Sequence, residues 1–169
     1  MGISFSNLAD EWFKEKSESP IYHSAKENSE YLIKKIFEKA KRNVAIYAGG
    51  ENISLYDNEE VKNKIKSKKL EVLVIAGNEQ DTKELSKIFT DVHIKCLNRD
   101  LTLNLEYFVP DKEYHQAKYF LAVDNQYVRI EKPQSSSSDI KAISSICFVK
   151  NKNLATLLTN LIRHLIRND

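Results

Sequence analysis

The pattern of hydrophobic and polar residues divides the chain into two parts. In the first part, stretches with apolar residues at helical spacing alternate with short, continuous apolar runs. Two of these runs, Val44–Ala48 and Leu70–Ala76, are each followed by a glycine, Gly49 or Gly77. Continuous apolar runs predict strands that are buried on both faces. Their alternation with helices predicts an α/β layer fold in which these strands are parallel neighbours.

Four helices are predicted in this first part, each with a polar residue at its start. The first two cover about residues 6–17 and 24–42, and the next two carry apolar stripes around residues 61–65 and 85–89. The predicted capping residues are Ser6, Ser24, Asn58 and Asp81. A strand with one wetter face is predicted around Ile94, where apolar and polar residues alternate.

The second part of the chain has β-like runs with no helix between them. These runs cover residues 103–109, 117–123, 127–130 and 143–149, and a polar loop is predicted at Ser135–Asp139. A last helix after Asn151 carries a complete apolar stripe, with leucine or isoleucine at positions 154, 157, 158, 161, 162, 165 and 166. The whole pattern predicts an α/β fold with a mixed sheet, first parallel and then antiparallel, flanked by helices.

Length and composition predict one domain over residues 1–169, with residues 1–23 as an N-terminal helical extension. The chain is 41% hydrophobic and 30% charged, which is typical of a soluble globular protein. Cys96 and Cys147 each lie in an apolar run without partners at zinc spacing, so we expect buried free thiols, no metal and no cofactor. Free thiols and the lack of a membrane-length apolar run favour a cytoplasmic location.

The charge pattern gives little indication of a partner. The net charge is only +2, so no global basic field points to nucleic acid. Lysines and arginines do gather between Lys34 and Arg42 and between Lys62 and Lys69. Both clusters fall on predicted helices, where such runs are typical of solvated faces.

The candidate chemistry lies around a predicted hairpin. Two β-rich runs flank Asp124-Asn125-Gln126, which predicts a hairpin with a three-residue loop. His115 and Lys118 lie at its mouth, and Asp124 lies at its turn. Residues three apart on a regular strand point to opposite faces, so His115 and Lys118 diverge unless a bulge or loop lies between them. An aspartate before Asn-Gln is also typical of a turn, where its carboxylate accepts backbone N–H groups.

This hairpin resembles the core hairpin of phospholipase D-like proteins, and the predicted order of elements over residues 24–167 resembles one half-unit of that fold. The family motif is His-x-Lys, four residues, Asp, and then a Gly-Ser or Gly-Asn segment. The resemblance implies that His115 is a phosphate nucleophile, that Lys118 holds phosphate oxygens and that Asp124 supports the histidine. A single half-unit also implies a homodimer.

The motif is degenerate in this sequence. Counted from His115, the family lysine and aspartate fall on Ala117 and Ala122. Counted back from Asp124, the family histidine and lysine fall on Ala117 and Tyr119. The later Gly-Ser segment is replaced by residues 129–132, which include a carboxylate that repels a phosphodiester.

Two main functions fit these observations. The first is a catalytically silent module, a pseudoenzyme, that uses Lys118, Arg129 and Glu131 to bind a phosphorylated or acidic ligand or to act in regulation. The alternative is a homodimeric, metal-independent phosphodiesterase or nuclease with His115, Lys118 and Asp124 from each chain. A third class is an interaction module whose helix faces bind a protein partner. The spacing departures favour the silent module over an enzyme.

Overall fold

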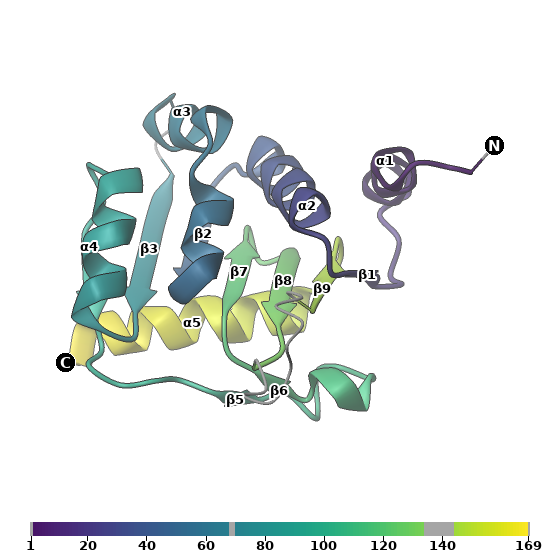
Figure 1. Cartoon of the computed structure of the whole chain (residues 1–169). Coiled ribbons are helices and arrows are strands. Elements are labelled where there is room, and N and C mark those ends of the chain that lie inside the picture. The colour runs from purple at the N-terminus through teal and green to yellow at the C-terminus, as the bar shows by residue number, and fades with distance from the viewer. Residues whose placement is uncertain (1, 68–69, 134–143, 169) are drawn as a thin grey trace.

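In the computed structural model, which describes residues 2–67, 70–133 and 144–168, helices cover both faces of a seven-stranded sheet (Figure 1). The strand order is β1-β9-β8-β7-β2-β3-β4. The strands are β1 Ile21–His23, β2 Asn43–Tyr47, β3 Glu71–Ala76, β4 Ile94–Cys96, β7 Phe120–Val123, β8 Tyr127–Glu131 and β9 Ser145–Phe148. The neighbours β2, β3 and β4 are parallel, and every other pair is antiparallel. This arrangement confirms the predicted mixed α/β fold.

Helices and a few short elements complete the chain. The helices are α1 Phe5–Glu15, α2 Lys26–Lys39, α3 Glu59–Ser67, α4 Glu79–Ile88 and α5 Lys152–Asn168, with 3-10 turns at η1 Gly50–Tyr56 and η2 Lys112–Tyr114. A small second sheet pairs β5 Leu103–Asn104 with β6 Gln116–Ala117.

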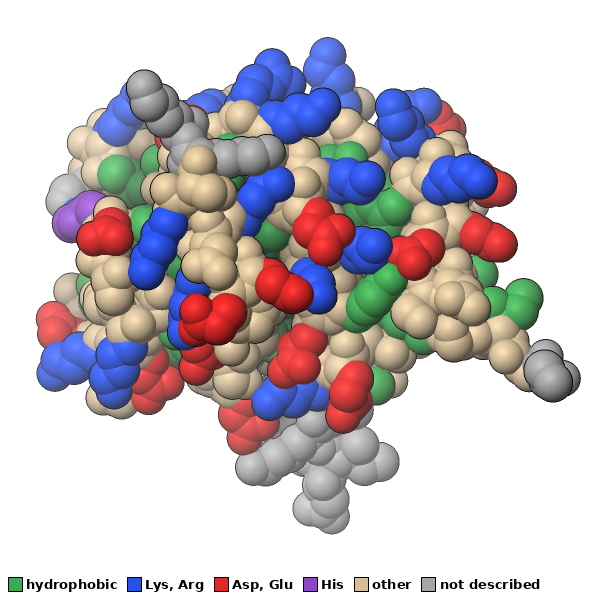
Figure 2. Space-filling view, turned by 90° about the horizontal axis from the view of Figure 1, so that it is seen from above, with side chains coloured by type: hydrophobic (Ala, Val, Ile, Leu, Met, Phe, Trp, Pro, Cys, Tyr) green, Lys and Arg blue, Asp and Glu red, His purple; other side chains and the backbone are tan. Residues whose placement is uncertain are grey.

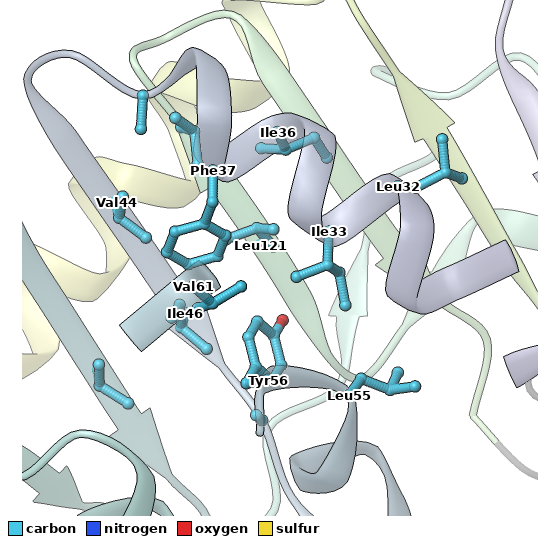
Figure 3. Close-up of a cluster of buried hydrophobic side chains, with 14 of the residues drawn as sticks. Leu32, Ile33, Ile36, Phe37, Val44, Ile46, Leu55, Tyr56, Val61 and Leu121 are labelled. Carbon is cyan, nitrogen blue, oxygen red and sulfur yellow. The ribbon is translucent and has the colours of Figure 1, made fainter. Parts of the chain in front are cut away.

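The core has two layers, one on each face of the large sheet. On one face, α1, α2, η1, α3 and α4 bury their apolar sides. Figure 3 shows Ile33 and Phe37 of α2 pointing toward Val44, Ile46 and Leu121 on the strands. The other face is covered by α5 and by the segment between β4 and β7. Because both faces are covered, the central strand β2 is buried along its whole length, as its continuous apolar run predicts.

The two ends of the sheet differ, and we call them the carboxyl end and the turn end. The carboxyl end is the end at which β2 and β3 finish and β7 begins. The turn end is the opposite end, where residues 124–126 connect β7 to β8. In Figure 1 the carboxyl end lies at the bottom of the sheet and the turn end at the top.

The predicted caps of α3 and α4 have different outcomes. Asn58 caps α3 as expected, since its side-chain oxygen accepts the Val61 N–H at 2.8 Å. The prediction of Asp81 as the cap of α4 is wrong. Asn78 is the capping residue and accepts the Asp81 N–H at 2.8 Å, which places Asp81 in the first helical turn.

The predicted caps of α1 and α2 are also displaced. Ser4, not Ser6, caps α1 by accepting a backbone N–H. Helix α2 has Ala25 at its N-cap and no side-chain cap, so the capping box predicted at Ser24 does not form. The sequence pattern missed the short strand Ile21–His23, whose pairing with β9 moves the helix start beyond Ser24.

The strand predicted over residues 103–109 is mostly a turn. Only Leu103–Asn104 pairs with another strand. Asn104 then accepts the Glu106 N–H with its side chain, and Leu105 O accepts the N–H groups of Phe108 and Val109, so the chain leaves the extended conformation.

Other predictions also have a structural outcome. Both cysteines are free, but only Cys147 is buried, and burial raises the pKa of its thiol to about 12. The predicted loop at Ser135–Asp139 lies outside the described residues. In the part of the chain that the structure describes, no helix combines the length and apolarity that a membrane span requires.

Candidate functional site

Asp124 has a structural role at the turn end. It adopts a left-handed conformation (φ 54°), as does Asn125 beside it. Its carboxylate accepts three backbone N–H groups, from Lys41 at 2.6 Å, Arg42 at 2.8 Å and Asn43 at 2.9 Å. The turn chemistry expected of this aspartate is therefore present, and it fastens the β7–β8 turn to the junction between α2 and β2.

The three candidate catalytic residues do not converge. His115 Nε2 lies 2.9 Å from the carbonyl oxygen of Val109, and Lys118 Nζ lies 3.1 Å from Asp100 Oδ2. Lys118 and Asp124 flank β7 and are six residues apart, so they lie about 20 Å apart at ~3.3 Å per residue. Within the described residues, no hydrogen bond or ion pair joins any two of His115, Lys118 and Asp124.

A β-bulge lies at the start of β7. The Lys118 N–H donates to Glu131 O at 3.0 Å, and the Glu131 N–H donates to Tyr119 O at 3.0 Å. Lys118 and Tyr119 therefore both oppose Glu131, which is the pattern of a bulge. The bulge places Tyr119 next to Glu131, which is part of the segment that replaces the family's Gly-Ser segment. Counted from Asp124, Tyr119 occupies the position of the family lysine.

Behind this bulge, polar side chains form a row across the strands. His23 of β1, Ser145 of β9 and Glu131 of β8 are direct cross-strand partners, so their side chains lie on one face. Arg129 lies two residues before Glu131 on the same face. The side chains of Arg129 and Glu131 are 1% and 4% exposed and form an ion pair.

Two further groups complete this buried network from the covering layer. Arg129 donates to Ser145 Oγ at 2.9 Å and to Ser29 Oγ of α2 at 3.2 Å. Asn52 of η1 donates to the Glu131 carboxylate. Neutral side chains thus also hydrogen-bond to both members of the ion pair. A buried ion pair without such additional hydrogen bonds would be strongly destabilising. We call His23, Ser29, Asn52, Arg129, Glu131 and Ser145 the buried network.

The buried network keeps His23 neutral. Burial, and secondarily the positive charge of Arg129, lowers the pKa of His23 from 6.5 to about 3. Its Nδ1 lies 3.1 Å from Ser29 Oγ. His23 Nε2, Asn52 Oδ1 and Arg129 Nε are buried without a partner in the described residues. Each buried polar atom without a partner lowers the stability of the fold by about 1–3 kcal/mol. The buried network is therefore less favourable for stability than apolar side chains in the same place would be.

The carboxyl end beside this network is lined by acids and tyrosines. A Cβ on Gly49 would lie 2.5 Å from Asp81 Oδ2 and 2.7 Å from the Tyr119 hydroxyl, so a larger residue at this position would displace these side chains. Burial raises the pKa of Tyr119 to about 12, and nearby Asp81, Asp100 and Glu131 contribute. Tyr119 is therefore protonated at neutral pH, and the ammonium group of Lys118 lies 5.3 Å from the centre of its ring.

The structure separates the residues that were predicted to bind a ligand. Lys118 is partly exposed at the carboxyl end, whereas Arg129 and Glu131 are in the buried network. Glu131 is not solvated, and Lys132 pairs with Glu113 instead. Within the described residues, no group of three or more His, Cys, Asp or Glu side chains is placed to hold a metal ion.

Sequence reasoning missed His23, Ser29, Asn52 and Ser145 as members of a site. The available signal was a charged residue at each of two β-like positions, 129 and 131, which share a face. Two opposite charges on the same face of a predicted inner strand require buried polar partners. The identity of those partners depends on strand pairing that the sequence does not reveal.

Comparison with known proteins identifies the fold. No family model and no curated protein matches the chain. Among solved structures, the chain is similar to TrmBL2, an archaeal chromatin protein described with a novel mode of DNA binding (TM-score 0.62, 10% identity). The match covers 95% of this chain but only 58% of the TrmBL2 chain.

Two further solved structures are similar to the chain, and one of them links the fold to phospholipase D. NucT from Helicobacter pylori has a TM-score of 0.52, and Nuc from Salmonella typhimurium, a phospholipase D family member, has a TM-score of 0.51. Each is 10% identical, and each match covers 88% of this chain and 95% of the other. The chain therefore has the phospholipase D-like fold.

Proposed function

We propose that this protein is a catalytically silent phospholipase D-like module that binds a phosphorylated or acidic ligand, with nucleic acid as the favoured class. One observation carries the silent part of the proposal. Glu131 occupies the region of the family's Gly-Ser segment, and its carboxylate is fixed there by Arg129 and Asn52. The carboxylate and its guanidinium partner are only 4% and 1% exposed and neutralise each other, so a phosphodiester meets neither the small residue of the family segment nor a free cation there.

The position of the candidate nucleophile supports the same proposal. Attack on phosphorus requires an imidazole nitrogen and a phosphate-binding cation that reach one phosphorus atom together. Here His115 Nε2 contacts a backbone carbonyl, and Lys118 contacts Asp100. At the position counted from Asp124, the family histidine is replaced by Ala117, which is fully buried.

The nature of the ligand is inferred from the fold and its neighbours. One neighbour is described as binding DNA, and another belongs to the phospholipase D family. Proteins of this fold thus include some that interact with DNA. Lys118 is the predicted ligand residue whose ammonium group reaches the surface, with 25% of its side chain exposed. Direct ligand contact by Arg129 and Glu131 stays a prediction, as do the homodimer, a protein partner and the cytoplasmic location.

The test combines cleavage and binding assays on the purified protein. Single- and double-stranded DNA, RNA and bis-p-nitrophenyl phosphate are incubated with EDTA present, beside a His115→Ala variant. We expect no cleavage by either protein, together with measurable nucleic-acid binding. Metal-independent cleavage that disappears in His115→Ala would refute the silent module and establish the nuclease alternative.

A binding comparison then tests the predicted ligand residue. Lys118→Ala removes the ammonium group at the carboxyl end, and Lys132→Ala removes a similar lysine that also pairs with one carboxylate, Glu113. If Lys118 contacts the ligand, only the first variant weakens binding. Equal affinities of the two variants and the unmodified protein would exclude Lys118 from the ligand contact.

A further inference from the structure

A polar hollow of about 520 Å³ lies at the turn end, at the opposite end of the sheet from Lys118. Four separate segments line it: the end of α1, the junction between α2 and β2, the β7–β8 turn, and the connection from β9 to α5. The lining residues are Lys16, Arg42, Asp124, Asn125, Gln126, Lys150 and Lys152. Every one of them is polar or charged, and four of them carry a positive charge.

The only carboxylate in the lining is already engaged. Both oxygens of Asp124 accept backbone N–H groups from residues 41–43, so this group faces the chain rather than a ligand. Among the cations, Lys150 pairs with the exposed Glu18 at 2.9 Å. Lys16, Arg42 and Lys152 have no ion-pair partner among the described residues. The hollow therefore carries an excess of unpaired positive charge.

Several lysines of the two basic runs seen in the sequence differ from these cations because they have carboxylate partners, although Arg42 of the hollow is itself the last residue of the first run. In the first run, Lys34 pairs with Glu60 at 2.6 Å and Lys35 with Asp10 at 3.0 Å. In the second run, Lys62 pairs with Asp57. Carboxylates thus neutralise these lysines locally, whereas three of the four cations of the hollow are left without one.

Lys and Arg side chains are numerous on the surface at the turn end. Figure 2 looks down onto the turn end and shows Lys and Arg side chains predominating in the upper half of the view, while most Asp and Glu side chains lie lower. Positive charge thus extends over part of this end of the molecule although the net charge of the chain is only +2.

We propose that this hollow binds the phosphate groups of a nucleic-acid backbone. Pockets for small molecules are lined mainly by apolar and aromatic side chains, which pack against rings and chains. This hollow has none in its lining, so it recognises a ligand by charge, as lysines and arginines recognise backbone phosphates. The choice of nucleic acid rests on the proposed function, and the site differs from the one that the phospholipase D resemblance implies.

The main test measures the binding of a fluorescein-labelled DNA duplex by anisotropy over a series of salt concentrations. The hollow variant carries Lys16→Gln, Arg42→Gln and Lys152→Gln. The control variant carries Lys34→Gln, Lys35→Gln and Lys62→Gln, which change lysines that are paired with carboxylates. Both variants lose three positive charges, so net charge is matched and only position differs. Circular dichroism and urea unfolding establish that both are folded.

We expect the hollow variant to lose at least about tenfold in affinity, with a clearly smaller loss in the control. Each phosphate contact removed lowers the slope of log K against log salt by about 0.9, so three contacts lower it by about 2.7. Equal losses in both variants, or no loss in the hollow variant, would overturn the proposal.

Two further arms separate this proposal from the proposed function. Lys118→Ala is measured with the same duplex; a loss in that variant alone would reject the hollow but keep nucleic-acid binding. Pyrophosphate is then titrated into the unmodified protein and the hollow variant by calorimetry. Binding of pyrophosphate that the hollow variant loses, without duplex binding, would reject nucleic acid as the ligand. Absence of both kinds of binding would reject the hollow as a phosphate site.

Discussion

The two ends of the sheet use charge in opposite ways. At the carboxyl end, the Arg129–Glu131 pair is buried and balanced, and Lys118 at the surface is matched by Asp100. At the turn end, the Asp124 carboxylate is directed into the backbone, and nearby cations remain unmatched. Balanced buried charges hold each other in place, because leaving either one unpaired is costly, whereas unmatched surface charge attracts an oppositely charged partner. The unmatched charge is the reason for placing nucleic-acid binding at the turn end, and ligand contact through Lys118 at the carboxyl end stays a separate prediction.

The largest expected effect tests the rigidity of the carboxyl end. Arg129→Met keeps much of the side-chain volume but leaves Glu131 buried with Asn52 as its remaining side-chain partner. Removing one member of a buried pair costs about 3–5 kcal/mol, because an uncompensated charge stays inside. Urea unfolding should show a loss of this size in the free energy of unfolding.

A double variant provides the control for this prediction. Arg129→Met combined with Glu131→Gln removes both charges, so the unfolding free energy should recover most of the loss. A single variant within about 1 kcal/mol of the unmodified protein would show that the pair is solvated and that the carboxyl end is not rigidly held.

The next effect concerns α5, which packs against β2, β3, β7 and β8 and therefore supports both ends. Leu158 is fully buried, so Leu158→Ala should lower the free energy of unfolding by about 2–5 kcal/mol through lost burial and a cavity. Leu157→Ala is the matched control, because Leu157 is 38% exposed, and we expect a clearly smaller change. Similar losses from the two variants in thermal and urea unfolding would contradict this placement of the helix.

Much of the fold was predictable because its signals are local. The continuous apolar run of β2 indicates a strand that is buried on both faces, and the complete apolar stripe of α5 indicates which face of the helix is buried. Asn58 was identifiable as a cap from its place before an apolar stripe. The short strand β1 was not predictable, since three residues after a proline carry no periodic signal and depend on pairing with β9.

The sites were harder to predict because they combine distant residues. The cations of the hollow come from positions 16, 42, 150 and 152, and of these only Arg42 belongs to a basic cluster of the sequence. Some lysines of the clusters that the sequence does show are neutralised by carboxylates on other elements, such as Lys34 by Glu60. Degeneracy of the family motif was visible from spacing, but the bulge at Lys118 and Tyr119 required the backbone hydrogen bonds of Glu131.

The next prediction concerns the pH dependence of the free energy of unfolding, which tests whether water is excluded from the buried network. The folded-state pKa of His23 is about 3 against an ordinary value of 6.5, so between these values the unfolded chain binds more protons. The free energy of unfolding therefore falls as pH drops below about 6.5. At pH 5 this histidine alone should account for about 2 kcal/mol of the loss.

The measurement compares urea unfolding at pH 7 and pH 5 in three proteins. The His23→Gln variant should lose about 2 kcal/mol less than the unmodified protein over this interval, whatever its stability at pH 7. His93→Gln changes an exposed histidine and should follow the unmodified protein. Identical pH dependence in all three would mean that His23 titrates as in water and that the network is hydrated.

The smallest effect is expected at the turn end, where Asp124→Asn separates the two functions suggested for this residue. Asparagine tolerates the left-handed conformation but has one acceptor oxygen instead of two. At least one of the three hydrogen bonds from backbone N–H groups is therefore weakened. We expect a loss of about 1 kcal/mol in unfolding free energy. Duplex affinity should be unchanged or higher, because the variant removes the only negative charge lining the hollow.

The nuclease alternative expects instead that Asp124→Asn abolishes cleavage, since the aspartate would then support a histidine. Unfolding and anisotropy on the same preparation distinguish these outcomes, and a fall in duplex affinity without a fall in stability would contradict the structural role of Asp124.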